Sequence, residues 1–157
     1  VEKLLDGVAA AAATRVGLGL PWQFGAMTVA ALSFAVLFAV PRRFIGAAIL
    51  SGAVGWMATG LATRYLPGNV GAFVASLSVG TFANGCARVT KRPAQVFQLP
   101  GLMLLVPGSF GFLSLEEFLR GRYVEGAEKA FAMLMIAGGL VMGILAANVL
   151  LPSRKLL

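Results

Sequence analysis

The sequence has no histidine, one cysteine and few charged residues of either sign. Charged residues make up 12% of the 157 residues, about half of the share in a soluble domain, and 59% of the residues are hydrophobic. A soluble chain of this length needs a polar shell, because much of its surface stays in contact with water after folding. The composition therefore excludes a soluble globular domain and predicts a chain that folds in lipid.

Because histidine is absent, the chain has no Ser/His/Asp set and no Cys/His cluster for zinc. The single cysteine, Cys86, lies within an apolar run and is expected to be a small core residue. No glycine loop that could cradle a phosphate precedes a helix, and the adjacent Glu116 and Glu117 point in different directions on a helix. We therefore expect no enzymatic activity, no metal site and no cofactor.

The net charge is +7, but the basic residues stand at the ends of apolar runs. A nucleic-acid-binding protein would gather them on one folded surface, so we expect no nucleic acid partner. Basic residues beside apolar runs are instead typical of membrane spans whose flanks face the cytoplasm. The chain is therefore expected to lie in a lipid bilayer.

Five apolar segments follow a more polar beginning. Residues 1–20 are expected to form a lead-in helix, and residues 21–157 a membrane domain; because the first residue is Val1, the chain is expected to be a fragment or a processed product. The expected spans are residues 22–40, 44–63, 70–87 and 130–151. A fourth segment, residues 94–112, precedes a charged connection over residues 113–129. The fold class is an all-α, polytopic membrane helix bundle with about five transmembrane segments.

An odd number of spans places the two ends of the chain on opposite sides of the membrane. One side holds one more basic residue than the other, and its basic residues lie closer to the spans, whereas four glutamates accompany the basic residues of the last connection. The richer side contains Arg42, Arg43, Arg88, Lys91, Arg92, Arg154 and Lys155. We therefore predict a cytoplasmic C-terminus.

The fourth segment contains two Pro-Gly pairs, Pro100-Gly101 and Pro107-Gly108. Proline removes a backbone donor and glycine loosens a helix, so the segment is predicted to be broken, with a plain proline kink as the alternative. Broken membrane helices mark substrate sites in transporters, because the half-helix after the break directs N–H groups and a positive dipole at an anion. Here those groups would belong to Gly108 and Ser109.

The third span carries small and polar residues at every fourth position: Ala72, Ser76, Gly80, Asn84 and Arg88. Such a stripe is typical of a packing seam between membrane helices. Alternatively, Ser76 and Asn84 line a polar cavity and Arg88 attracts an anionic substrate. Gly139, Gly143 and Ala147 give the last span a separate helix-packing pattern. The candidate substrate-binding residues are Ser76, Asn84, Arg88, Gln98, Pro107, Gly108 and Ser109.

The order of these features resembles the C-terminal half of the threonine/serine exporter family. The resemblance covers residues 30–155; it is carried by FAVPRRF, VASLSVGTFANGCARVTKRPAQVF and, most specifically, QLPGLMLLVPGSFGF. It implies a pair of five-span halves, either fused or separate subunits of a homo- or hetero-oligomer, the other half bearing an additional hydrophilic region. It also implies export of small amino acids such as threonine and serine, or of small dicarboxylates such as succinate.

Secondary exporters often couple to protons through a carboxylate in the membrane. Neither the four charge-free spans nor the broken segment, as bounded above, contains Asp or Glu. A coupling carboxylate is therefore expected on the complementary N-terminal half, and this chain alone is not expected to transport. The alternative to an exporter half is a non-transporting membrane scaffold or assembly subunit.

Overall fold

The computed structural model describes residues 20–65 and 70–152, and these residues are helical throughout apart from short turns. The elements are α2 (Leu20–Leu37), the short 3-10 helix η1 (Arg42–Phe44), α3 (Ile45–Tyr65), α4 (Val70–Thr90), α5 (Gln95–Leu105), α6 (Gly108–Leu119) and α7 (Tyr123–Leu150). The all-α prediction is confirmed. The predicted lead-in helix of residues 1–20 lies outside the described residues except for its last position.

In the part of the chain that the structure describes, four segments are long and apolar enough to cross a membrane: Arg42–Ala62, Val70–Thr90, Gln95–Leu119 and Tyr123–Leu150. A shorter apolar helix covers Trp22–Leu37. These five segments correspond to the five that the sequence predicts, and the chain is an integral membrane protein.

The prediction that residues 113–129 form a charged connection is wrong at both of its ends. Helix α6 continues to Leu119 and α7 already begins at Tyr123, so only a short turn separates them. Gly121 supplies the positive φ of 76° that this turn requires. The charges do not interrupt the helices because they pair along and between them; Arg120, for example, lies 2.5 Å from Glu116, one turn earlier.

Small side chains fill the interior and many large apolar side chains face outward. The fully covered positions on α2, α3 and α4 include Ala31, Ala48 and Ala83, whereas Val36 and Leu37 are exposed. This arrangement suits lipid, because small residues let helices approach one another and large apolar residues contact acyl chains without cost.

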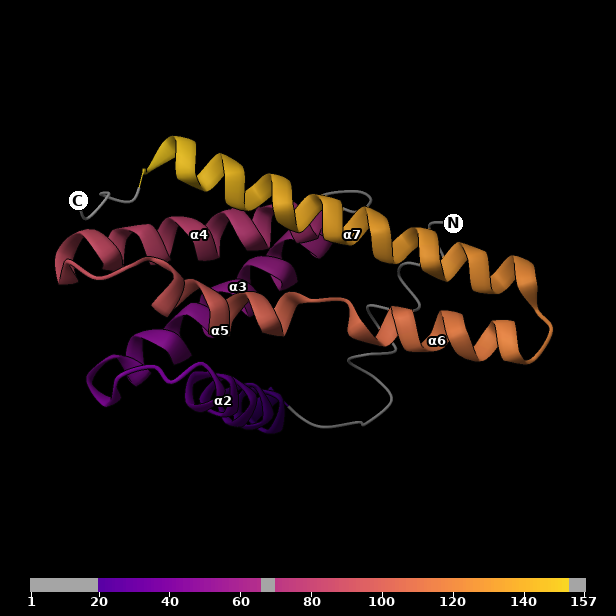
Figure 1. Cartoon of the computed structure of the whole chain (residues 1–157), viewed down its shortest axis with the longest axis horizontal. Helices are drawn as coiled ribbons and strands as arrows, with labels where there is room; N and C mark the ends of the chain where they lie inside the picture. Colours follow the sequence, from indigo (N-terminus) through magenta and orange to yellow (C-terminus); the bar gives the residue numbers. More distant parts are fainter. Residues whose placement is uncertain (1–19, 66–69, 153–157) are drawn as a thin grey trace.

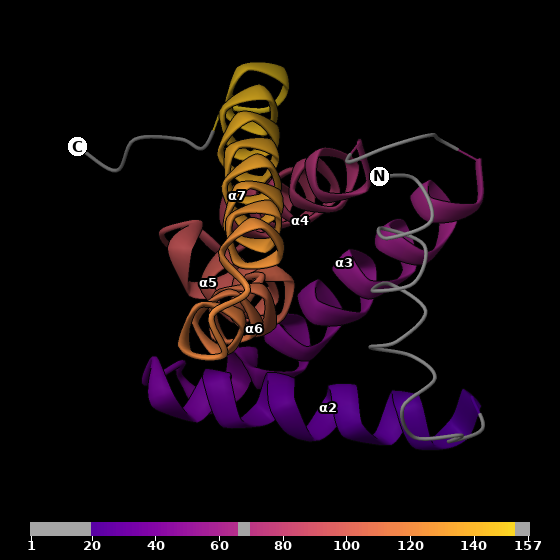
Figure 2. The same cartoon turned by 90° about the vertical axis from the view of Figure 1, so that its right-hand side faces the viewer.

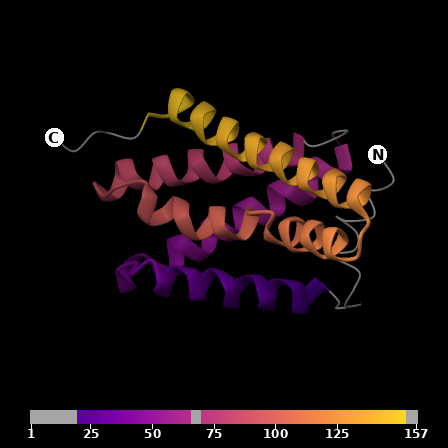
Figure 3. The same ribbon diagram turned by 45° about the vertical axis from the view of Figure 1, so that its right-hand side comes forward.

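Helix α4 lies centrally, with α7 running along it in the same direction and α3 and α5 packed on its other sides (Figures 1 and 2). Helix α2 packs on α3 and α5 (Figure 3), and α6 packs on α7 as a hairpin that extends beyond the other described helices (Figure 1). Phe44 packs edge-on against Phe97, with ring centroids 5.4 Å apart. This contact brings the turn containing Arg42 and Arg43 to the end of the bundle where α5 begins.

Candidate functional site

The stripe on α4 lies against α7. At Gly143 of α7 an added Cβ would collide with the Ser76 hydroxyl and the Phe73 carbonyl of α4. One turn further along, a Cβ on Gly80 would lie 2.6 Å from the Ala147 side chain. The two four-residue patterns in the sequence, one on each helix, are therefore the two sides of a single close contact, which we call the α4–α7 seam.

Polar bonds close the seam at its basic end. Asn84 is fully buried, and its side-chain amide donates to the side-chain oxygen Oδ1 of Asn148 at 2.9 Å and to the backbone carbonyl of Ala147 at 3.4 Å. Arg88 donates from Nε and Nη2 to the Pro152 carbonyl, at 3.1 and 2.8 Å. The arginine thereby satisfies a backbone acceptor just beyond the end of α7.

Asn84 makes these bonds through its nitrogen, and its own carbonyl oxygen, Oδ1, is buried without a hydrogen-bond partner. Ser76 is also fully covered, and its hydroxyl donates to the Phe73 carbonyl at 3.1 Å. Both residues therefore occupy the packing seam that the sequence offered as one of two interpretations.

The fourth segment is broken at its second Pro-Gly pair. Helix α5 ends at Leu105; Val106 is extended, with ψ at 127°, and Pro107 has a ψ of 51° before α6 begins at Gly108. Because proline has no N–H, the Met103 carbonyl four residues earlier has no helical donor. The predicted break is confirmed, and Val106 and Gly108 on either side of Pro107 are exposed.

The first Pro-Gly pair does not break the helix. Pro100 lies inside α5, and Gly101 packs against Ser51 of α3 and Val79 of α4. A Cβ at Gly101 would meet the Ser51 hydroxyl and would lie 3.1 Å from Val79. Glycine is needed here for a close approach between helices rather than for flexibility.

The start of α6 offers fewer free amides than its position suggests. The Gly108 N–H already bonds to the Val106 carbonyl at 2.8 Å, and the Phe110 N–H bonds to the Pro107 carbonyl at 3.2 Å. Ser109 lies between them and is exposed, and the space around Gly108 is open. Ser109 is therefore the residue of this turn best placed to donate to a ligand.

The candidate residues fall into two groups. Pro107 lines a groove against Ala137 and Leu140 of α7, whereas Asn84 binds α7 at Ala147 and Asn148, roughly 10–15 Å further along at 1.5 Å per residue. Gln98 is partly buried on α5, about two turns before the break. Ser76, at the level of Gly143, is the candidate residue of α4 nearest to the level of the break.

The broken segment does contain carboxylates, contrary to the prediction, because α6 runs on through Glu116 and Glu117. Glu117 is largely covered and forms ion pairs with Arg122 and, at 2.5 Å, with Lys129. These pairs join α6 to α7 beside their connecting turn, together with a 2.7 Å bond from the Ser114 hydroxyl to the Gly126 carbonyl. The expectation of a coupling carboxylate on the complementary half stays a prediction.

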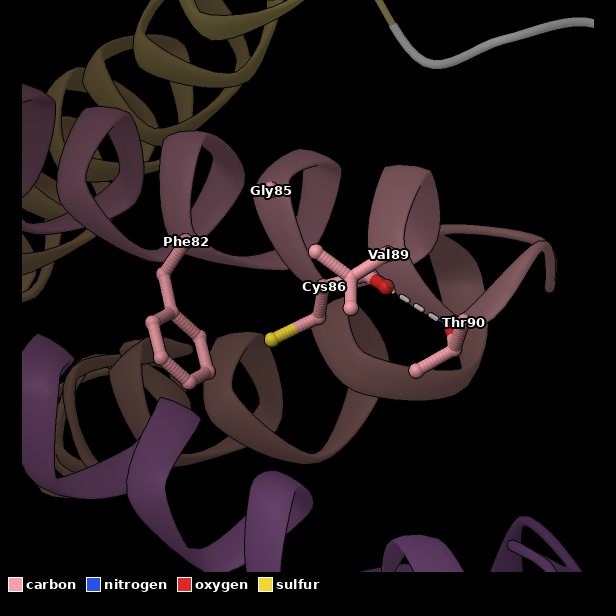
Figure 4. Close-up of a pocket in the computed structure, with 5 residues that line it drawn as sticks. All are labelled: Phe82, Gly85, Cys86, Val89 and Thr90. Carbon is pink, nitrogen blue, oxygen red and sulfur yellow. Dashed lines mark hydrogen bonds between the residues drawn. The ribbon is translucent and has the colours of Figure 1, made fainter.

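Cys86 is not in the core. It lies partly exposed on the side of α4 that α7 leaves open, beside Phe82 in a shallow hollow (Figure 4). Thr90 donates to the Cys86 carbonyl at 2.7 Å, a bond within the helix that satisfies its hydroxyl in an apolar environment. Within residues 20–65 and 70–152, no group of three His, Cys, Asp or Glu side chains could hold a metal ion.

Comparison with known proteins gives one finding. A family model described as Threonine/Serine exporter, ThrE, matches residues 23–150. No curated protein and no solved structure matches the chain. The matched range contains α3 to α7 in full and nearly all of α2, and therefore both the seam and the break.

Proposed function

Because the chain belongs to the threonine/serine exporter family, we propose that residues 21–157 are the membrane domain of one half of an exporter for threonine, serine or related small carboxylates. Family membership makes the chain an amino-acid export transporter and not an enzyme. The preceding residues, 1–20, are proposed to be the lead-in from another part of the same assembly.

The proposed location of the substrate site rests on the break between α5 and α6. Irregular backbone within the membrane is tolerated only where protein covers it or water reaches it. The break therefore belongs in a hydrated path through the exporter, where the Ser109 amide and hydroxyl, with the positive end of α6, receive the substrate carboxylate.

An amino acid also carries an ammonium group, and the other side of the break suits it. The last carbonyls of α5 form the negative end of a helix, and the Met103 carbonyl lacks a helical donor because Pro107 has no N–H. We propose that the ammonium group binds there while the carboxylate binds at Ser109. The two facing helix ends then match the two charges of one zwitterion.

The remaining candidate residues are proposed to act nearer the basic end. Arg88 is exposed at the end of α4 and retains N–H groups beyond those that bind Pro152, so it attracts carboxylates from that side. Ser76 and Asn84 are proposed to meet the substrate when the seam opens, and Gln98 to line the same path on α5. That basic end is proposed to face the cytoplasm of a bacterial inner membrane.

The partner in this proposal is a complementary exporter half, either fused to this chain or a separate subunit of a homo- or hetero-oligomer. The groups around the break face outward from the described helices, since Val106, Gly108 and Ser109 are exposed. A second half would enclose them and form the other wall of the path. On this proposal, the chain reconstituted alone does not move substrate against a gradient.

Ser109→Leu tests the function, measured as threonine export from preloaded cells that express the complete exporter. Ser109 is exposed, so the larger side chain does not disturb packing within the described helices, but it covers the donors at the break. We expect at least a tenfold loss of export with unchanged assembly. Ser33→Leu is the matched control, because Ser33 is exposed on α2 and its hydroxyl bonds only within that helix.

Normal export by the Ser109→Leu variant would contradict the proposed site. A variant that loses complex formation and not the transport step would support the alternative, a scaffold or assembly subunit. Asn84→Leu is less informative than the sequence suggests, because Asn84 is buried in the α4–α7 seam and its loss disturbs packing.

A further inference from the structure

We propose that an apolar groove beside the break is the subsite for the side chain of the exported amino acid. The inference rests on the proposed function and extends it, because it assigns selectivity among amino acids to particular residues. The groove has a volume of about 250 Å³. Met103, Val106 and Pro107 line one side of it, and Ala137, Leu140 and Val141 of α7 line the other.

A lipid acyl chain is a poor occupant for this groove. The adjoining backbone at Val106–Pro107 is irregular, and the Met103 carbonyl has no helical donor. A backbone carbonyl without a donor, such as that of Met103, is strongly disfavoured in hydrocarbon, and the neighbouring Val106 and Gly108 are not covered by the described helices. The mouth of the groove therefore faces a hydrated path, which an exported solute would use.

The lining selects an alkyl group and excludes a charge. All of the residues that form the groove are apolar, so its walls offer no side-chain hydrogen bond. Pro107 belongs both to the groove and to the turn that holds Ser109. An amino acid whose carboxylate binds at Ser109 can therefore place its side chain in the groove. The groove is smaller than the roughly 300–1,000 Å³ of sites for drug-sized ligands, which suits a single side chain.

The two walls of the groove belong to α5 with the following turn and to α7, and both helices pack on α4. Leu140 is 7% exposed and forms the covered part of the α7 wall, while Ala137 leaves room beside it. The width of the groove, and hence the size of side chain it accepts, is therefore set by these two residues of α7.

Threonine and serine differ by one methyl group, so their export ratio reports on the groove directly. Ala137→Leu fills the groove and should lower threonine export relative to serine export about fourfold, the effect of one buried methyl group. Both amino acids are measured in the same cells expressing the complete exporter. The ratio does not depend on how much of the variant folds. Ala127→Leu is the matched control on the same helix, at an exposed position outside the groove.

Leu140→Ala provides the opposite change. It enlarges the groove and should raise export of isoleucine, whose side chain is larger than that of threonine, relative to threonine about fourfold or more. An unchanged threonine-to-serine ratio in Ala137→Leu would overturn the subsite, and so would an equal loss of both substrates, since either result means that the groove does not sense the side chain. If Ser109→Leu leaves export intact, the proposed function fails; if Ser109→Leu abolishes export and the ratios do not move, the subsite alone fails.

Discussion

Single glycines decide how closely the helices approach. Gly143 is buried at the point where α7 meets the Ser76 hydroxyl and the Phe73 carbonyl, and a Cβ there would also lie 2.9 Å from the Leu77 nitrogen. Gly138, on the same helix, has nothing within 4 Å of the position of its Cβ. Replacing glycine by alanine is therefore expected to destabilise the folded bundle at Gly143 but not at Gly138, only five residues away.

We expect Gly143→Ala to lower the stability of the folded bundle by about 1–3 kcal/mol, the usual cost of overpacking. Gly138→Ala should be neutral or slightly stabilising, because alanine favours a helix more than glycine does. Thermal unfolding of the purified protein in detergent measures both. Equal midpoints for the two variants would mean that the α4–α7 seam is not as tight as described.

At the scale of the helices, apolar run length was enough to predict where the membrane segments lie. The Pro-Gly pairs predicted the break, but only Pro107 produces one, because Gly101 serves packing against Ser51 instead. The prediction of a connection over the charged residues 113–129 was wrong about where α6 ends and α7 begins. Ion pairs such as that between Glu117 and Lys129 let charged residues remain helical. Local composition cannot reveal pairing partners that the fold brings together.

Pro107→Ala tests the break itself. Alanine restores an N–H that can bond to the Met103 carbonyl, so α5 and α6 should join into a more continuous helix. We expect export to fall at least tenfold while the exporter still assembles. In a Cys86→Ser background, a cysteine introduced by Ser109→Cys should react more slowly with a water-soluble thiol reagent when Pro107→Ala is also present. Pro41→Ala, at an exposed turn, should have neither effect; full export by Pro107→Ala would exclude the break from transport.

At the scale of the whole molecule, one end of the described helices is basic and the other carries the glutamates of α6 and α7. Arg88 binds beyond the end of α7, and the Phe44–Phe97 contact gathers Arg42 and Arg43 at the same end. Arg154 and Lys155 lie outside the described residues. The sequence supplied the charge pattern, but it could not show that Asn84 and Asn148, far apart in the chain, meet across one seam. Assigning both packing patterns to a single contact required the fold.

This asymmetry predicts the orientation in the membrane. In a Cys86→Ser background, Arg92→Cys should react with a membrane-impermeant thiol reagent only when the cytoplasmic side is accessible. Tyr123→Cys, exposed at the opposite end of the bundle, should react from outside intact cells. Reversed labelling of the two positions would invert the proposed topology.

The short length of α5 has a consequence for biosynthesis. Its 11 residues extend only about 16 Å, roughly half of the hydrocarbon thickness, so α5 cannot settle across the bilayer as it leaves the insertion machinery. Insertion of this segment across the bilayer therefore requires that the 12 residues of α6 have also been synthesised. The nascent chain is then partitioned into lipid as one α5–α6 unit, and ribosome pausing or truncation between Leu105 and Leu119 should yield products that the cell's quality control removes.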